Sequence, residues 1–194
     1  MKEKAISSLP EVSQIEAELD RESYRHRYGR AFRGTVCTLI TVAAVAVLIA
    51  TLWLPVLQTY GNSMSPTIGD GNIVIATKTG DFKTSDIVAF YYNNKILVKR
   101  VIAGPGDWVD ITDDGTVYVN DVELDEPYIT NKALGDCNTE FPYQVPESRY
   151  FVMGDSRSIS VDSRNTMIGC VADEQIIGKV VFCVWPMNNF GTIN

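Results

Sequence analysis

Ser63 lies in a segment that is poorly suited to ordinary packing. It belongs to residues 61–67 (GNSMSPT), where a glycine precedes it and a proline follows three positions later. Small and turn-forming residues leave the backbone amides around such a serine free to face something other than a neighbouring strand. The Ser63 hydroxyl becomes a good nucleophile only if another side chain removes its proton. The segment therefore raises the question of which base the chain offers.

Histidine is the usual base for a serine nucleophile, but the chain has only one histidine, His26. It precedes an uncharged apolar run, residues 35–56, that we predict to cross a membrane, so His26 would lie on the opposite side from Ser63. A Ser-His-Asp triad and a Cys-His protease are therefore excluded after residue 56. A lysine can serve instead where burial lowers its pKa towards neutrality.

Lys99 is the lysine whose surroundings fit this role. It lies within the apolar sequence 96–102 (ILVKRVI), which is typical of a strand. Alternate residues of a strand share a face, so Lys99 would lie beside Leu97 and Val101, and such neighbours disfavour its charged form. Arg100 would face the other way and suits a structural ion pair. The alternative is that Lys99 is a charge that protects an edge strand from pairing with another chain.

A third segment, residues 153–164 (MGDSRSISVDSR), is dense in polar side chains. It contains two aspartates, two arginines and four serines. Acids and arginines at this spacing can build a buried, paired network that holds short hydroxyl side chains in place. A polar surface loop could have the same composition. We interpret the segment as a candidate support for the site.

The elements that must position these residues form three predicted parts. Residues 1–34 are polar and would be a cytoplasmic tail, with a helix that starts near Pro10. Residues 35–56 carry no charge and are long enough for one transmembrane helix. The five arginines just before them predict a cytoplasmic N-terminus. Residues 57–194 would then be an extracytoplasmic catalytic β domain. Two alternatives for residues 35–56 fit less well. A buried helix of a soluble protein would show a polar face, and a cleaved secretory signal would lie nearer the N-terminus.

The last part of the chain predicts β structure. Short stretches rich in β-branched and aromatic residues alternate with turn signals, which is typical of an all-β sandwich or a partly open barrel. The predicted strands are 72–77, 86–92, 96–102, 108–111, 116–119, 122–124, 149–153 and 176–184. The expected tight turns are Asn93-Asn94, Asp113-Asp114-Gly115 and Asn120-Asp121. Residues 125–148 show no periodicity and are expected to form a long surface excursion.

Composition excludes two classes of partner. Residues 57–194 hold ten basic and eighteen acidic side chains, so we expect no nucleic-acid partner. The four cysteines form no C-x-x-C pair and lie far from His26 in sequence, so we expect no metal. Nucleophilic chemistry at Ser63 would need no other cofactor. Three of the cysteines follow residue 57; they would allow one disulfide, and buried thiols are the alternative.

Together, these segments resemble the bacterial type I signal peptidases (leader peptidases), in the Gram-positive form with one membrane span. Residues 63–67 (SMSPT) resemble the S-M-x-P-T nucleophile motif of that family. Residues 86–90 (DIVAF) and 99–107 (KRVIAGPGD) resemble its next two motifs, and residues 154–164 resemble its last. The four motifs occur in the family's order and spacing, after an apolar run as in the family.

The resemblance implies a membrane-anchored serine endopeptidase that removes N-terminal signal peptides from exported preproteins after small-x-small motifs. It also implies a mainly β, signal-peptidase-like fold of coiled antiparallel sheets. Ser63 would be the acylated nucleophile and Lys99 the general base, with Ser160 orienting the Lys99 amine. The ionic residues expected to support them are Asp155, Arg157, Asp162 and Arg164. The residues expected to line the substrate pockets are Thr59, Tyr60, Gly61, Met64, Ile68 and Leu97.

Several consequences of the resemblance are specific to this chain. Gly61 has no side-chain hydroxyl to offer the oxyanion, so the Ser63 amide would contribute most there. Ser156 stands where the family usually has asparagine. The protein would contact membrane lipid and work near the protein translocation channel. The alternative is a catalytically silent relative in secretion or pilus assembly, but such a relative would have lost Ser63 or Lys99. A self-cleaving repressor would need a helix-turn-helix domain in place of the apolar run.

Overall fold

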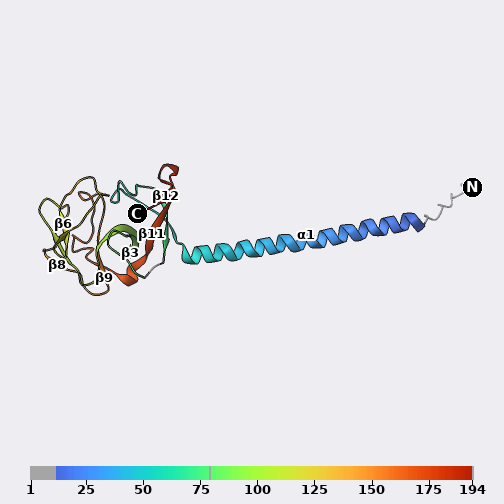
Figure 1. The fold of residues 1–194 in the computed structure, drawn as a ribbon, viewed down its shortest axis with the longest axis horizontal. Helices are drawn as coiled ribbons and strands as arrows, with labels where there is room; N and C mark the ends of the chain where they lie inside the picture. Colours follow the sequence, from blue (N-terminus) through green and yellow to red (C-terminus); the bar gives the residue numbers. More distant parts are fainter. Residues whose placement is uncertain (1–11, 79, 194) are drawn as a thin grey trace, which may run out of the picture. The chain divides into compact units, whose positions relative to one another are not determined.

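The computed structural model describes residues 12–78 and 80–193, and the chain divides into two units between Ile49 and Ala50. Helix α1 (Val12–Trp53) accounts for the described residues of the first unit and continues into the second (Figure 1). Residues 12–34 of the polar stretch and residues 35–53 of the apolar run are thus parts of one continuous helix. The helix start expected near Pro10 lies outside the described residues. The domain boundaries expected at residues 34 and 56 stay a prediction.

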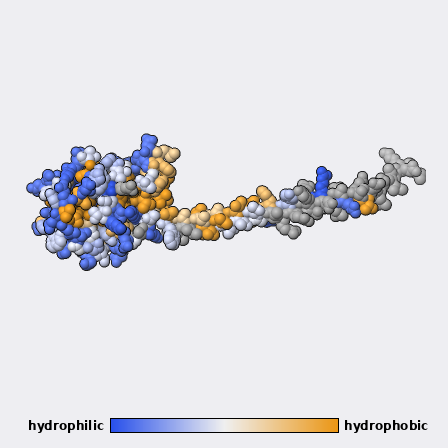
Figure 2. Space-filling view, in the orientation of Figure 1, coloured by the Kyte–Doolittle hydropathy of each residue, from blue (hydrophilic) through white to orange (hydrophobic). Residues whose placement is uncertain are grey.

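Apolar side chains are exposed along the second half of α1. Val36, Leu39, Ile40 and Val42 are among them, and Figure 2 shows the hydrophobic colour continuing along this stretch. Even so, none of the helices in the described part of the chain is long and apolar enough to cross a membrane, so the transmembrane helix expected over 35–56 is not confirmed.

The second unit is built on antiparallel sheets, which confirms the mainly β prediction. Within the described residues, one sheet has eight strands and the other has four. The larger sheet contains, in spatial order, β1 (Val56–Gln58), β2 (Ile73–Thr77), β11 (Ile176–Trp185), β3 (Ile87–Tyr92), β4 (Lys95–Ala103), β9 (Arg149–Met153) and β10 (Val171–Ala172), with β12 (Gly191–Thr192) beside β11. The smaller sheet contains β7 (Val122–Glu123), β6 (Val117–Val119), β5 (Trp108–Ile111) and β8 (Tyr143–Gln144). Two short 3₁₀ helices, η1 (Asp173–Gln175) and η2 (Met187–Asn189), flank β11.

Two-residue turns set the register of two hairpins. Asn93 and Asn94 have φ angles of 43° and 65° and join β3 to β4. Asn120 and Asp121 have φ angles of 51° and 64° and join β6 to β7. Positive φ at both central residues gives the type I′ turn, whose twist matches that of paired strands. The first turn matters most for function, because it fixes the register of the strand that carries Lys99.

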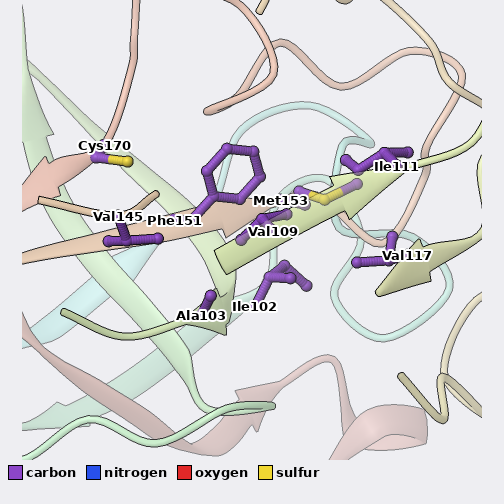
Figure 3. Close-up of a cluster of buried hydrophobic side chains, with 9 residues drawn as sticks. All are labelled: Ile102, Ala103, Val109, Ile111, Val117, Val145, Phe151, Met153 and Cys170. Carbon is purple, nitrogen blue, oxygen red and sulfur yellow. The ribbon is translucent and has the colours of Figure 1, made fainter. Parts of the chain in front are cut away.

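Buried apolar clusters hold the sheets together and anchor the segment around Ser63. One cluster joins the smaller sheet to β4 and β9 (Figure 3); its members are Ile102, Ala103, Val109, Ile111, Val117, Val145, Phe151, Met153 and Cys170. A second cluster contains Met64 and Ile68, which are 3% and 1% exposed. Ser63 therefore sits directly before an anchor residue, which limits the freedom of its backbone. All four cysteines are free thiols.

The prediction that residues 125–148 form a surface excursion is wrong in part. Strand β8 pairs with β5, and Val145 is 1% exposed within the cluster of Figure 3. The carbonyl oxygens of Ala133 and Leu134 accept hydrogen bonds of 3.1 and 2.6 Å from Arg164. Backbone carbonyls of this segment accept hydrogen bonds from side chains and do not pair with a long neighbouring strand, so the segment is irregular.

Candidate active site

Lys99 lies in strand β4, and its amine is buried. The residue is 3% exposed, and the register of β3 and β4 places it opposite Val88. Residues opposite one another in an antiparallel pair share a face, so Lys99 lies on the face that carries Val88 and Val101, both of which are fully buried. The Nζ atom donates a hydrogen bond of 2.8 Å to the Ser160 hydroxyl oxygen. The apolar surroundings predicted for Lys99 are therefore present.

This environment makes Lys99 an unusually weak base for a lysine. Burial lowers the pKa of Lys99 from 10.5 to about 8, because the ammonium loses its hydration. The charges of Asp162 and Asp155 act in the opposite direction, and the charge of Arg164 adds to the lowering. A lysine with this pKa has a substantial neutral fraction near pH 8, so its lone pair can accept a proton.

Ser160 links Lys99 to Asp162. The Ser160 hydroxyl accepts a hydrogen bond from Lys99 and is itself bonded to the Asp162 carboxylate. Burial raises the pKa of Asp162, but the bonds and charge of Arg164, with the Gly154 amide and Ser160, outweigh this and leave the pKa below its usual value. Asp162 is therefore an anion, which can accept a hydrogen bond from the Ser160 hydroxyl. The oxygen lone pairs of Ser160 are then left to hold the Lys99 amine.

Three arginines are fully buried in the described part of the chain, and each is paired with a carboxylate. The pairs, which we call the arginine network, are Arg100–Asp155 and Arg164–Asp162, both at 2.8 Å, and Arg157–Glu126. Every side chain in the network is at most 2% exposed. All three contacts join two guanidinium nitrogens to both oxygens of the carboxylate, which fixes orientation as well as distance.

The network differs in part from the expected support. Asp162 and Arg164 pair with each other, and Arg100 forms the structural ion pair expected of it. Asp155 and Arg157, however, find their partners outside residues 153–164. The partner of Arg157 is Glu126, which sequence reasoning missed because it lies in a stretch without periodicity.

Gly154 is a second residue that sequence reasoning passed over as a site member. A Cβ atom at this position would lie 2.5 Å from the Ser63 carbonyl oxygen and closer still to the Ser160 hydroxyl oxygen. That carbonyl accepts a hydrogen bond of 3.0 Å from the Ser156 amide. Only glycine lets the Ser63 segment and the turn that carries Ser160 approach this closely. The signal in the sequence was the glycine at the head of residues 154–164.

Ser63 lies in the wall of a small pocket. The pocket has a volume of about 40 Å³ and is lined by Thr59, Tyr60, Gly61, Ser63, Met64, Ile68, Ile96, Leu97 and Val98. The structure thus brings together all six residues expected to line the substrate pockets, and it adds Ile96 and Val98 from β4. A space of this size, with both polar and apolar walls, suits small side chains. A larger pocket of about 490 Å³, lined by residues between Glu123 and Lys132, contains none of the predicted residues.

The backbone amides near Ser63 differ in whether they are free to donate to a ligand. The Gly61 amide donates a hydrogen bond of 2.7 Å to the Asp70 carboxylate, so it is engaged within the protein. Among the described residues, none accepts a hydrogen bond from the amide or hydroxyl of Ser63. The Ser63 amide therefore remains available to a ligand. A search of the same residues finds no group of histidine, cysteine, aspartate or glutamate placed to hold a metal ion.

Comparison with known proteins gives consistent matches. The model of the family described as signal peptidase, peptidase S26, matches residues 32–185. Signal peptidase I from Bacillus licheniformis is 34% identical over 186 residues, which cover 88% of this chain and 97% of that protein. Signal peptidase IB from Staphylococcus aureus is 38% identical over 151 residues, which cover 67% of this chain and 77% of that protein.

A solved structure is also similar. The crystal structure of a signal peptidase I from Enterococcus faecalis V583 is 32% identical and covers 51% of this chain and 96% of its own, with a TM-score of 0.42.

Proposed function

The chain belongs to the signal peptidase family, peptidase S26, which makes it a serine peptidase that acts on preproteins, and we propose that Ser63 is its nucleophile and Lys99 its general base. The observation that carries the proposal is the buried Lys99 amine, whose pKa is lowered to about 8 and which is held at 2.8 Å by Ser160. The proposal is further supported by the position of Ser63 in the wall of a pocket for small side chains.

Acylation begins with neutral Lys99. Its amine takes the Ser63 hydroxyl proton while the serine oxygen attacks the carbonyl carbon of the scissile peptide bond. The resulting oxyanion accepts a hydrogen bond from the Ser63 amide, which has no acceptor among the described residues. The C–N bond then breaks, and the proton on Lys99 passes to the leaving amine. The products are the mature N-terminus and an ester between Ser63 and the signal peptide.

Deacylation uses the same base. Neutral Lys99 takes a proton from water, whose oxygen attacks the ester carbonyl, and the proton returns to the Ser63 oxygen as the ester bond breaks. Ser160 and Asp162 hold the amine in one orientation through both steps. The arginine network fixes the loop that carries these two residues.

The pocket beside Ser63 sets the substrate preference. Met64 and Ile68 line it and are buried, and Leu97 contributes from β4. A volume of about 40 Å³ has room for a small side chain only. We therefore assign cleavage after small-x-small motifs, with Thr59, Tyr60 and Gly61 completing the walls.

Substitution of the two reacting residues tests the proposal. Ser63→Ala and Lys99→Ala should each reduce cleavage of a preprotein with a small-x-small motif to background, with the product mass as the readout. Ser65→Ala is the matched control, since Ser65 is exposed in the same segment and should leave cleavage unchanged. Full activity in either Ser63→Ala or Lys99→Ala would contradict the assignment.

We further propose that residues 35–56 anchor the protein to the membrane near the translocation channel, with the catalytic domain on the extracytoplasmic side. The support is the 22-residue run without charge and the arginines that precede it. Cells that produce the full chain should retain it in the membrane fraction after alkaline carbonate extraction. Protease added outside should digest the part after residue 56; release of the intact chain by carbonate would contradict the anchor.

A further inference from the structure

Residues 126–128 (EPY) contact both halves of the candidate site. These residues begin a turn closed by a hydrogen bond of 3.3 Å from the Ile129 amide to the Glu126 carbonyl oxygen. The Glu126 side chain is 2% exposed and pairs with Arg157 in the loop that carries Ser160. The Tyr128 ring lies 3.8 Å from the guanidinium carbon of Arg100, in the strand that carries Lys99.

Glu126 reaches Ser160 through a short series of contacts. Both of its carboxylate oxygens accept hydrogen bonds from Arg157, and the Arg157 Nε atom donates a bond of 3.2 Å to the Gly154 carbonyl oxygen. Gly154 is the residue where a Cβ atom would collide with Ser160 and the Ser63 backbone. Glu126 is therefore linked, through Arg157, to Gly154, where the Ser63 segment and the turn that carries Ser160 come closest.

Tyr128 ties this arrangement to strand β4. Its hydroxyl donates a hydrogen bond of 3.0 Å to Glu126, while its ring covers Arg100, the neighbour of Lys99. Burial and then the Glu126 charge raise the pKa of Tyr128, so its hydroxyl stays protonated and remains a donor. An aromatic ring over a desolvated guanidinium is attractive. The turn at residues 126–128 thus contacts two buried arginines. Arg100 is the neighbour of Lys99 in strand β4, and Arg157 lies in the loop that carries Ser160.

We propose that Glu126 and Tyr128 are positioning residues for the peptidase reaction, which set the contact between Lys99 and Ser160 through Arg157 and Arg100. Neither touches the pocket beside Ser63. The proposal rests on the assignment of Ser63 and Lys99 above. It gives the irregular segment after β7 a role in the chemistry, although the segment contributes no reacting group.

The test compares Glu126→Gln with Glu123→Gln in the purified full-length chain. Glu126→Gln keeps the shape of the side chain and removes the charge that orients Arg157. Glu123 is a matched control, because it is an exposed carboxylate three residues away whose partner, Lys132, is also exposed. Because small misplacements of reacting groups are costly, Glu126→Gln should lower kcat at least about tenfold, with KM within about twofold of wild type. Glu123→Gln should leave both constants unchanged.

The pH profile separates positioning from a general loss of folded protein. Loosening of the turn would hydrate the Lys99 amine, so the acidic limb of kcat/KM should move to higher pH in Glu126→Gln. The charged groups that act on this amine are Asp155, Asp162 and Arg164, and none of them is changed. A smaller amount of correctly folded enzyme would lower the apparent kcat and leave the limb in place. A wild-type kcat and an unmoved limb would overturn the proposal.

A second variant covers the case in which Glu126→Gln does not fold. Tyr128→Leu keeps the Glu126–Arg157 pair and removes the ring over Arg100, and it should lower kcat with KM retained. Tyr128→Phe keeps the ring and should restore most of the rate. Wild-type kcat in Tyr128→Leu would overturn the proposal. Either failure is distinct from failure of the assigned mechanism, in which Ser63→Ala or Lys99→Ala would remain active.

Discussion

The buried arginines and the buried lysine of the site differ in how their charge is handled. Each arginine of the arginine network meets a carboxylate in a two-pronged contact, so its charge is matched inside the protein. Lys99 is equally buried, yet it meets the Ser160 hydroxyl and forms no ion pair in the part of the chain that the structure describes. The same sheet and loop therefore hold three permanent cations and one amine that can lose its proton.

The difference follows from the two side chains. A guanidinium keeps its proton in proteins, so burial requires a partner, and the partners then fix the loop. A lysine that is buried without a carboxylate partner lowers its pKa instead. The arginine network thus supplies a rigid support, and Lys99 is the reactive group in the mechanism that we propose.

Lys99→Arg replaces the buried lysine with a guanidinium like those of the three arginines in the arginine network. Arginine cannot act as a base at ordinary pH, so peptide cleavage should fall by roughly 10²–10⁴-fold or more, the usual contribution of a general base. The measurement is kcat/KM on a small-x-small peptide. Lys95→Arg in the same strand is the control, since Lys95 is exposed and should tolerate the change. Retention of wild-type activity in Lys99→Arg would show that no deprotonated side chain is needed there.

Arg164→Met removes one member of the arginine network. It leaves the Asp162 carboxylate buried without its ion-pair partner, which should lower the free energy of unfolding by about 3–5 kcal/mol. Chemical denaturation measures the loss. Lys132→Met is the matched control, because the Lys132–Glu123 pair is 42% and 56% exposed and its loss should lower the free energy of unfolding much less. Equal losses in the two variants would contradict the contrast between paired buried charges and surface pairs.

Lys99 should also make stability depend on pH. Its folded pKa of about 8 is below the ordinary value of 10.5, so between these pH values the unfolded chain binds more protons than the folded chain. The free energy of unfolding should therefore rise with pH across this window, by about 3 kcal/mol in total from this group. The Lys99→Met variant lacks the contribution. Denaturation at pH values from 7 to 11 gives the free energy of unfolding of wild type and variant. The difference between the two should change by that amount over this range; a difference that does not change with pH would contradict the lowered pKa.

The sequence predicted most of the strands, but it missed four short ones and did not predict that α1 is continuous. Strands β3, β4, β5 and β9 were expected within one or two residues of their observed bounds, because alternation and turn pairs such as Asn93-Asn94 are local signals. Strands β1, β8, β10 and β12 were missed, since two or three residues are too few to show a period. Their pairing is decided by the neighbouring strand rather than by their own residues. Strands β6 and β7 are as short but were predicted, because the Asn120-Asp121 turn lies between them.

The candidate site shows the same limit. Ser63, Lys99 and Ser160 were singled out from residue types and from motifs that resemble a family, and the structure places Lys99 against Ser160. Glu126 and Tyr128 could not be found this way. Their contacts with Arg157 and Arg100 join positions about 30 residues apart, and nothing in the local pattern of residues 125–148 marks them. The ion pair between Arg100 and Asp155 likewise became visible only in three dimensions.

The central claim is that Lys99 is neutral enough near pH 8 to act as a base. NMR titration of the Lys99 side chain measures this directly, with labelled lysine in the full-length Ser63→Ala variant so that no turnover occurs. The Lys99→Met variant identifies the signal. The account predicts a midpoint near pH 8 for Lys99. A midpoint near 10.5, the ordinary value for lysine, would contradict it.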